Sequence, residues 1–156
     1  MNPNPAKEQP SSSRSLSEER HCYLIALVED SPADAFFIQE AITIHDIPAN
    51  VMVIRDGEEA VRLVNRADAE ETAPCPALFL VDLNIPTKNG AEVLAHIRNS
   101  KRCRSTPVVV VTSSDSEKDR SRVKALGANR YFHKPADYDS FLTIGEVIKD
   151  VLKIKA

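Results

Sequence analysis

Short apolar runs alternate with helical patterns along most of this chain, and this alternation is the feature that most limits its fold. The runs are four to six residues long, which suits strands better than helices. The most apolar of them, at residues 108–111, is typical of a parallel strand that is covered on both faces. The predicted strands are residues 23–28, 51–54, 78–81, 108–111 and 130–133.

The segments between these runs carry apolar residues at helical spacing. Ser31 and Pro32 are typical of a helix cap and a first helical residue, and Gly127 is typical of a helix end. Five strand–helix units in succession predict an α/β fold, with a parallel sheet that has helices on both faces. The predicted helices are residues 31–41, 57–66, 89–99, 117–126 and 137–154.

The composition allows one domain with an amino-terminal tail. The chain has 156 residues, of which 42% are hydrophobic, enough for one core. Residues 1–20 contain three prolines and five serines but few apolar residues. Because such a segment cannot bury a core, we predict a flexible tail at residues 1–20 and one domain at residues 21–156.

Charge and hydropathy argue against several classes of partner. The net charge of −3 and the pI near 5.8 do not fit a general nucleic-acid binder. The chain has no apolar stretch of the roughly 18 residues that a membrane span needs, and no secretory signal pattern. We therefore expect a cytoplasmic protein with no nucleic-acid or membrane partner. Because Cys22, Cys75 and Cys103 are odd in number and widely spaced, we predict reduced, unpaired thiols.

Polar side chains follow four of the predicted strands at the point where each strand ends. Glu29 and Asp30 follow the first strand, Asp82 the third, Thr112 the fourth and Lys134 the fifth. Taken singly, each could be a turn residue, a charge near a helix start or a β-branched strand end. The carboxyl ends of parallel strands meet at one edge of the sheet, where open α/β sheets build their sites. Their joint placement therefore favours a functional site.

The acids in this set predict a magnesium site. Mg²⁺ prefers oxygen ligands from one or two carboxylates and keeps several waters. Asp30 and Asp82 could supply two carboxylates, Glu29 could act through a water, and the backbone carbonyl of Asn84 could add a further oxygen.

The remaining groups predict phosphoryl transfer. The carboxylate of Asp82 could act as a nucleophile and form an aspartyl-phosphate. Lys134 would neutralise a phosphoryl oxygen, and the hydroxyl of Thr112 would bind another.

These motifs, in this order, resemble those of bacterial response-regulator receiver domains. The resemblance covers residue 21 to the carboxyl terminus. The loop at residues 65–76 and the Asp-Leu-Asn turn look most like the small receivers that partner phytochrome kinases. The motifs are Val28-Glu29-Asp30, Val81-Asp82-Leu83-Asn84-Ile85-Pro86, Asn89-Gly90, Val111-Thr112-Ser113, Ala125-Leu126-Gly127-Ala128 and Tyr131-Phe132-His133-Lys134-Pro135.

The resemblance implies a flavodoxin-like (βα)5 doubly wound sheet with the strand order 2-1-3-4-5. It also implies that Asp82 is the phosphoacceptor. Mg²⁺ would be bound by Asp30, Asp82, Glu29 and the carbonyl of Asn84, with Glu29 standing where many members have the shorter Asp.

Three further roles are implied by the same resemblance. Thr112 would be the hydroxyl that senses the phosphoryl group, and Lys134 the lysine that binds it. Tyr131 would be the aromatic residue that swings between inward and outward positions. The implied partner is a sensor histidine kinase, with a bacteriophytochrome as the candidate that the subgroup suggests.

The end of the sequence bears on the output of such a receiver. No basic helix-turn-helix pattern follows residue 154, so we expect a stand-alone response regulator that signals by protein contact and not as an enzyme. The expected contact face is formed by residues 117–126, 130–133 and 137–154. A core stripe explains about five of the apolar residues of the last helix, and the others predict a homodimer through this face. These apolar residues are Phe141, Leu142, Ile144, Val147, Ile148, Val151, Leu152 and Ile154.

Two alternatives stay open. An aspartyl-phosphate phosphatase of the haloacid dehalogenase type would use the same nucleophile and metal. That class has a second Asp as general acid two residues later, where this chain has Asn84. A receiver-shaped scaffold that is never phosphorylated would be expected to lose an acid, the hydroxyl or the lysine, and this chain keeps them all.

Overall fold

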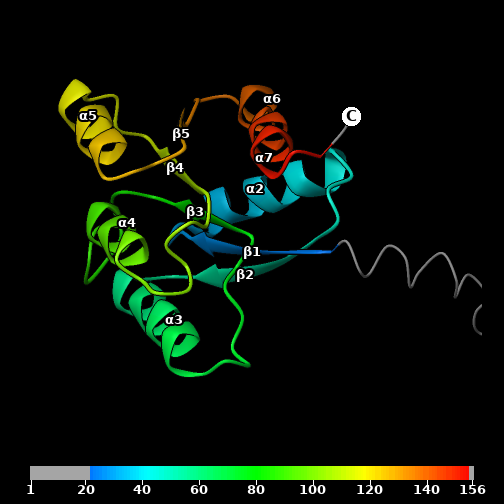
Figure 1. The fold of residues 1–156 in the computed structure, drawn as a ribbon. Coiled ribbons are helices and arrows are strands. Elements are labelled where there is room, and N and C mark those ends of the chain that lie inside the picture. The colour runs from blue at the N-terminus through cyan, green and yellow to red at the C-terminus, as the bar shows by residue number, and fades with distance from the viewer. Residues whose placement is uncertain (1–21, 155–156) are drawn as a thin grey trace, which may run out of the picture.

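A computed structural model describes residues 22–154, which form one parallel sheet between two layers of helices (Figure 1). The predicted tail at residues 1–20 lies outside the described residues. The strands are β1 (Tyr23–Val28), β2 (Ala49–Ile54), β3 (Leu78–Val81), β4 (Val108–Thr112) and β5 (Arg130–His133). The helices are α2 (Pro32–Ile44), α3 (Gly57–Ala69), α4 (Gly90–Arg98), α5 (Glu117–Ala125), α6 (Tyr138–Phe141) and α7 (Ile144–Leu152).

The sheet has the order β2-β1-β3-β4-β5, and every neighbouring pair is parallel. The predicted flavodoxin-like α/β fold and its strand order are therefore confirmed. In the register between β1 and β3, Val28 lies opposite Val81, so the residues that follow these two strands leave the sheet side by side.

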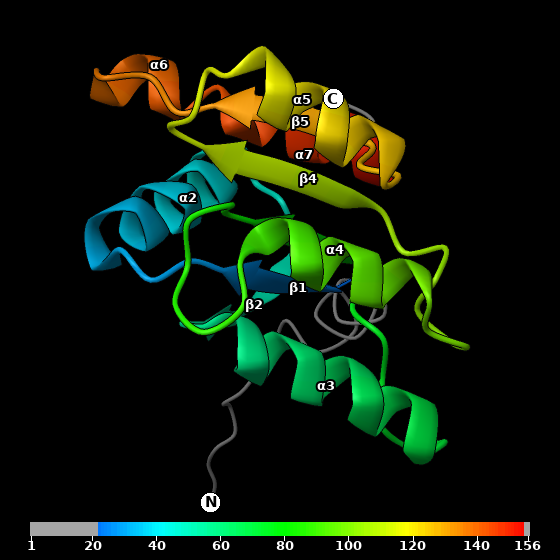
Figure 2. The ribbon, with the colours of Figure 1, turned by 90° about the vertical axis from the view of Figure 1, so that its left-hand side faces the viewer.

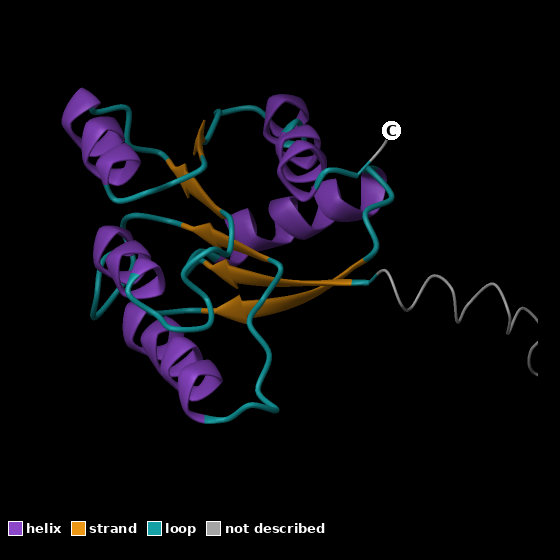
Figure 3. Ribbon diagram, viewed as in Figure 1, coloured by secondary structure: helices purple, strands orange, loops and turns teal. Residues whose placement is uncertain are grey.

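Apolar side chains fill both faces of the sheet, because alternate strand residues point to opposite sides. One core cluster joins the strands to α3, α4 and α5, and the other joins them to α2, α6 and α7. Figure 2 views the first of these layers, and Figure 3 shows both on either side of the strands. All residues of β3 and β4 are buried, which explains the unbroken apolar runs in the sequence.

Local signals set several helix ends as predicted. The Ser31 hydroxyl accepts a hydrogen bond from the Asp34 N–H at 3.2 Å, and Pro32 occupies the first helical position of α2. Gly127 follows α5 with a φ of 99°, a left-handed conformation that favours glycine. None of the helices in residues 22–154 is long and apolar enough to cross a membrane.

Two predictions differ from the structure. The helix predicted at residues 137–154 is divided into α6 and α7, because the chain tightens between them: the N–H groups of Thr143 and Gly145 donate to carbonyls three residues earlier. The prediction of unpaired thiols is wrong for Cys75 and Cys103, which form a disulfide, while Cys22 is free and exposed. The loops that lead into the neighbouring strands β3 and β4 bring these two residues together.

Candidate functional site

Lys134 is the centre of a charged cluster at the carboxyl edge of the sheet. It follows β5, and its backbone N–H donates to the carbonyl of Thr112 at 2.8 Å, which fixes the start of its side chain beside β4. The amino nitrogen of Lys134 then reaches across β4 to the exits of β1 and β3, where three carboxylate oxygens surround it. These are Oε1 of Glu29 at 2.9 Å, Oδ2 of Asp34 at 2.7 Å and Oδ2 of Asp82 at 3.0 Å.

Asp34 is a member of this cluster that was not predicted from the sequence. It lies in the first turn of α2, and its main-chain N–H completes the Ser31 cap while its side chain binds Lys134. One sequence signal could have identified Asp34: it is an acidic residue about one helical turn after the acids that follow the first strand. The first turn of a helix that follows such a strand begins over the same edge of the sheet.

Contacts with nearby backbone groups fix the position of Asp82. The side chain is buried, and its Oδ1 accepts a hydrogen bond from the Asn84 N–H at 3.3 Å. Gly90, the first residue of α4, packs against the Asp82 carbonyl so closely that a β-carbon would come within 2.3 Å of that oxygen. A residue larger than glycine at position 90 would therefore displace α4 or the loop that carries Asp82.

Three acids are arranged as a divalent cation would require. One carboxylate oxygen from each of Glu29, Asp30 and Asp82 lies within 4.8 Å of the others. Oε2 of Glu29 accepts a hydrogen bond from the Ser31 N–H at 3.1 Å. Oε1 of Glu29 is buried and, among the described residues, has an ion-pair contact with Lys134 but no partner in hydrogen-bond geometry. A buried oxygen with spare acceptor capacity beside two more carboxylates fits Mg²⁺.

The charges in this cluster oppose one another. Burial, strengthened by the nearby charge of Asp82, raises the pKa of Glu29 to about 7, although Lys134 acts in the opposite direction. Burial alone would lower the pKa of Lys134, but its contacts with Asp34 and Glu29, together with the charge of Asp82, outweigh burial and raise it. Lys134 is therefore a permanent cation among carboxylates that outnumber it, and an additional cation would relieve the excess negative charge.

The two predicted switch residues meet at the loop after β4. Thr112 is fully buried, and its hydroxyl oxygen accepts a hydrogen bond from the Ser114 N–H at 3.2 Å. The Tyr131 hydroxyl donates to the Ser114 carbonyl at 2.8 Å, and the guanidinium of Arg120 lies 4.3 Å from the centre of its ring. Thr112 and Tyr131 are therefore coupled through the backbone of one residue.

One protein family has a sequence pattern that this chain matches over residues 25–144, a range that includes the strand ends described above. It is the family of the response regulator receiver domain. The chain belongs to this family. The predicted resemblance is therefore confirmed.

Known relatives agree with this assignment. The chain is similar to response regulator Rcp1 of Synechocystis sp., with 39% identity over 111 residues, which is 71% of this chain and 76% of that protein. It is also similar to the probable methanogenesis regulatory protein FilR2 of Methanothrix harundinacea, with 33% identity over 82% of each chain.

Two solved structures of response regulators have the same fold. The phosphorylated cyanobacterial phytochrome response regulator RcpA has a TM-score of 0.77 and 36% identity, over 86% of this chain and 96% of its own. The Mn²⁺-bound form of Rcp1 has a TM-score of 0.75 and 33% identity, over 86% of this chain and 97% of its own. The similarity to RcpA agrees with the subgroup that the sequence motifs suggested.

Proposed function

We propose that this chain is a response regulator that accepts a phosphoryl group from a histidine kinase on Asp82 and passes the signal on by protein contact. The observation that carries the proposal is Lys134, a cation that touches carboxylates from β1, α2 and β3 at the carboxyl edge of the sheet. Such a cluster would be electrostatically costly if it only stabilised the fold. Within this proposal the chain is a phosphoacceptor and not an enzyme that turns over a substrate.

Each residue has a role that its contacts support. An oxygen of Asp82 attacks phosphorus and forms the new P–O bond while the bond from phosphorus to the imidazole nitrogen of the kinase breaks. Lys134, already 3.0 Å from Asp82, neutralises a phosphoryl oxygen. The Thr112 hydroxyl oxygen accepts from the Ser114 N–H, so its own hydrogen is free to donate to another phosphoryl oxygen.

The proposal includes Mg²⁺, held by Asp30, Asp82, Glu29 and the backbone carbonyl of Asn84. When bound, the ion would neutralise charge that develops on the phosphoryl oxygens. The clustered oxygens and the spare acceptor capacity of Glu29 support this assignment. So does the similarity to Rcp1, which has been solved with Mn²⁺ bound.

Labelling of Asp82 tests the proposed function. Asp82→Asn should abolish labelling by acetyl phosphate in the presence of Mg²⁺, because an amide cannot act as the nucleophile. Asp139→Asn, at an exposed acid in α6, is the matched control and should be labelled normally. Undiminished labelling of the Asp82 variant would place the acceptor elsewhere. Normal folding of both proteins without any labelling would instead favour the phosphorylation-independent scaffold.

Metal binding tests the ligand set separately. Asp30→Asn removes a carboxylate from a site with few protein ligands, so we expect Mg²⁺ affinity to fall by about tenfold or more. Asp30 is exposed, so the fold should not change. Calorimetric titration of both proteins with Mg²⁺ measures the effect, and equal affinities would rule out this ligand set.

The proposed kinase partner is a phytochrome, in the cytoplasm. The support is similarity: RcpA is a cyanobacterial phytochrome response regulator, and the bacteriophytochrome response regulator RtBRR has 34% identity and a TM-score of 0.69.

The proposed contact face is formed by α5, β5, α6 and α7, and we propose that it pairs two copies of the chain. The last helical segment leaves less free apolar surface for pairing than the sequence indicated. Its apolar residues are buried, or half-buried against the cluster shared with α2. Phosphorylation would bias pairing through Thr112 and Tyr131, which meet at Ser114 beside this face. Light scattering with and without a phosphoryl mimic tests this, and a strict monomer in both conditions would contradict it.

A further inference from the structure

A disulfide joins two loops at the amino edge of the sheet, on the opposite side of the domain from Asp82. Cys75 lies in the loop that leads into β3, and Cys103 lies in the loop that leads into β4. Their Cα atoms are 5.6 Å apart although the residues are 28 positions apart in the sequence. Because β3 and β4 are neighbours, the bond connects the starts of the two strands that end in Asp82 and Thr112.

The same two loops are also held together without the disulfide. The guanidinium of Arg102, next to Cys103, donates hydrogen bonds to three carbonyl oxygens at the end of α3 and in the loop before Cys75. These belong to Ala67 at 2.6 Å, Glu70 at 3.0 Å and Ala73 at 2.8 Å. The two sulfur atoms would therefore stay near each other after the bond breaks, which favours its re-formation.

The carboxylate of Asp68 in α3 strengthens this arrangement from the other side. Its Oδ1 accepts hydrogen bonds from the Ser100 hydroxyl at 2.7 Å and the Arg102 N–H at 3.0 Å. The Ser100 hydroxyl oxygen in turn accepts from the Cys103 N–H at 3.0 Å. The backbone at Cys103 is thus fixed by polar contacts that do not depend on its sulfur.

The two cysteines differ in their access to solvent. Cys103 is fully buried, whereas Cys75 is half-buried in a surface loop. An external thiol can therefore approach the Cys75 side of the bond, with Cys103 as the sulfur that leaves. This asymmetry is typical of a disulfide that opens by exchange, in which attack depends on access to one sulfur.

We propose that Cys75 and Cys103 form a reversible redox pair that exchanges with small thiols and their disulfides, such as glutathione. A thiolate attacks the Cys75 sulfur, a mixed disulfide forms, and Cys103 leaves as a thiolate that takes up a proton. A second small thiol attacks the small-molecule sulfur, which releases Cys75 as a thiolate that is then protonated. Two electrons and two protons pass to the protein, and one small-molecule disulfide forms. Oxidation is the reverse. Since permanent disulfides are rare in the cytoplasm proposed for this chain, a reversible pair fits better than a fixed cross-link.

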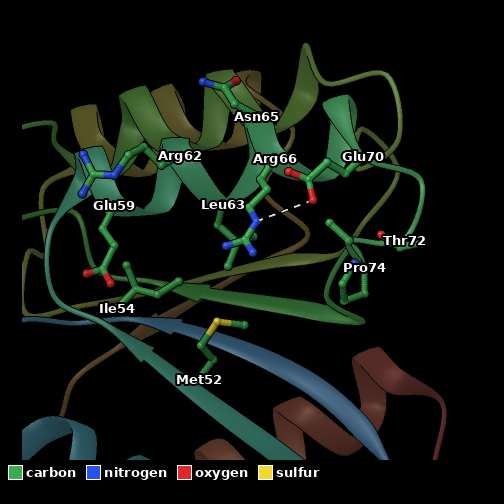
Figure 4. A pocket seen from close by; sticks show the side chains of 11 residues that line it. Met52, Ile54, Glu59, Arg62, Leu63, Asn65, Arg66, Glu70, Thr72 and Pro74 are labelled. Carbon is green, nitrogen blue, oxygen red and sulfur yellow. Dashed lines mark ion pairs between the residues drawn. The ribbon is translucent and has the colours of Figure 1, made fainter.

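The loop that leads to Cys75 forms one side of a cavity between β2 and α3 (Figure 4). The cavity has a volume of about 750 Å³. Its apolar lining comes from Met52 and Ile54 of β2 and from Leu63 of α3. Thr72 and Pro74, three residues and one residue before Cys75, lie along its other side. The closed disulfide fixes this side of the cavity, and reduction leaves it held by hydrogen bonds, among them those of Arg102.

Reversibility is tested by equilibrating the full chain with glutathione buffers of graded redox potential and trapping free thiols by alkylation. Mass spectrometry should show Cys75 and Cys103 gaining label together, through a single two-electron transition, while the exposed Cys22 is not part of it. A bond that stays closed in excess reduced glutathione in the folded protein would overturn the proposal. So would two thiols that never pair in excess glutathione disulfide.

The effect of the disulfide on stability and on the loop before β3 is tested by thermal melting and by amide exchange. The oxidised protein should melt about 5 to 10 °C above the reduced protein, because the cross-link restricts the unfolded chain. Exchange of the Ala73 amide, which donates to the Glu70 carbonyl, should be faster after reduction. Cys75→Ser and Cys103→Ser should each remove both differences, and Cys22→Ser should keep them. Equal melting temperatures and equal exchange rates in the two redox states would mean that the disulfide does not fix this loop, which would contradict the proposal.

Discussion

The two edges of the sheet use their cations in opposite ways. At the carboxyl edge, Lys134 contacts side-chain carboxylates, and Glu29, Asp34 and Asp82 together outnumber it. At the amino edge, Arg98 and Arg102 donate mainly to backbone carbonyls of the loops around them. The carboxyl edge therefore concentrates negative charge, while the amino edge satisfies the polar groups of its loops.

This difference separates the proposed phosphoryl chemistry from the hydrogen bonds that support the loops, within one small domain. A cluster in which burial and the neighbouring acid Asp82 raise the pKa of Glu29 favours the binding of an additional cation. At the amino edge, the loop carbonyls already accept hydrogen bonds from Arg98 and Arg102. These bonds fix the starts of β3, β4 and β5. Substitutions at the carboxyl edge should therefore change labelling, and substitutions at the amino edge should change stability.

The largest expected effect is on labelling by Lys134→Met. The variant removes the cation that we propose neutralises a phosphoryl oxygen, so the rate of labelling by acetyl phosphate should fall by about a hundredfold to a thousandfold. Lys124→Met, at an exposed lysine in α5, is the control and should be labelled at the normal rate. Circular dichroism confirms that the compared samples are folded. A fall of less than threefold would mean that Lys134 holds the acids together without contributing to the transfer.

The second effect is on stability, from Arg98→Met at the opposite edge. The half-buried guanidinium of Arg98 donates to the carbonyls of Gly127, Arg104 and Thr106 and to the side chain of Asn129. Its loss should lower the free energy of unfolding by about 2 kcal/mol, since carbonyls lose charged partners. Urea unfolding measures this.

Two further measurements make the Arg98 result specific. Arg104→Met, at an exposed side chain in the adjoining loop, should change the free energy of unfolding by less than about 0.5 kcal/mol. Labelling per folded molecule should be normal for Arg98→Met. If that variant lost labelling as Lys134→Met does, the division of roles between the two edges would be wrong.

The sequence was sufficient to predict the parts of the site that lie at strand ends. Glu29, Asp82 and Lys134 each follow an apolar run, and parallel strands that are buried on both faces bring their carboxyl ends to one edge. Asp34 was not predicted to join them, because it lies in a helix. The side on which a helical residue faces the sheet depends on how the whole helix packs, which a local pattern does not specify.

The amino edge was less predictable for a related reason. Cys75 and Cys103 occupy loops with no apolar periodicity, so only the strand order places them together. The same reasoning that joined the acids applies to them, since the segments before neighbouring parallel strands also meet at one edge. The division between α6 and α7 has no comparable signal, because apolar residues on both sides of Thr143 continue at helical spacing.

The smallest expected effect is the pH dependence of Asp68→Asn at the amino edge. Hydrogen bonds from the Arg102 N–H and the Ser100 hydroxyl hold the pKa of Asp68 below its usual value of 3.8. A carboxylate with a lowered pKa in the folded state stabilises the protein above the pKa of the unfolded chain. This contribution is lost as the pH falls through the lower, folded value. The variant should therefore be less stable than the natural protein at pH 6, and the difference should shrink as the pH falls below about 4.

The difference should be small, because both of these bonds end on Oδ1, and the amide oxygen of an asparagine can accept them in its place. Urea unfolding of both proteins at several pH values measures it, with Asp115→Asn, at an exposed acid in the loop before α5, as control. A difference that grew as the pH fell would contradict the argument, because it would require Asp68 to bind its proton more tightly in the folded state. Labelling of Asp82 should not change in the Asp68 variant at any of these pH values, since Asp68 lies at the opposite edge of the sheet from Asp82.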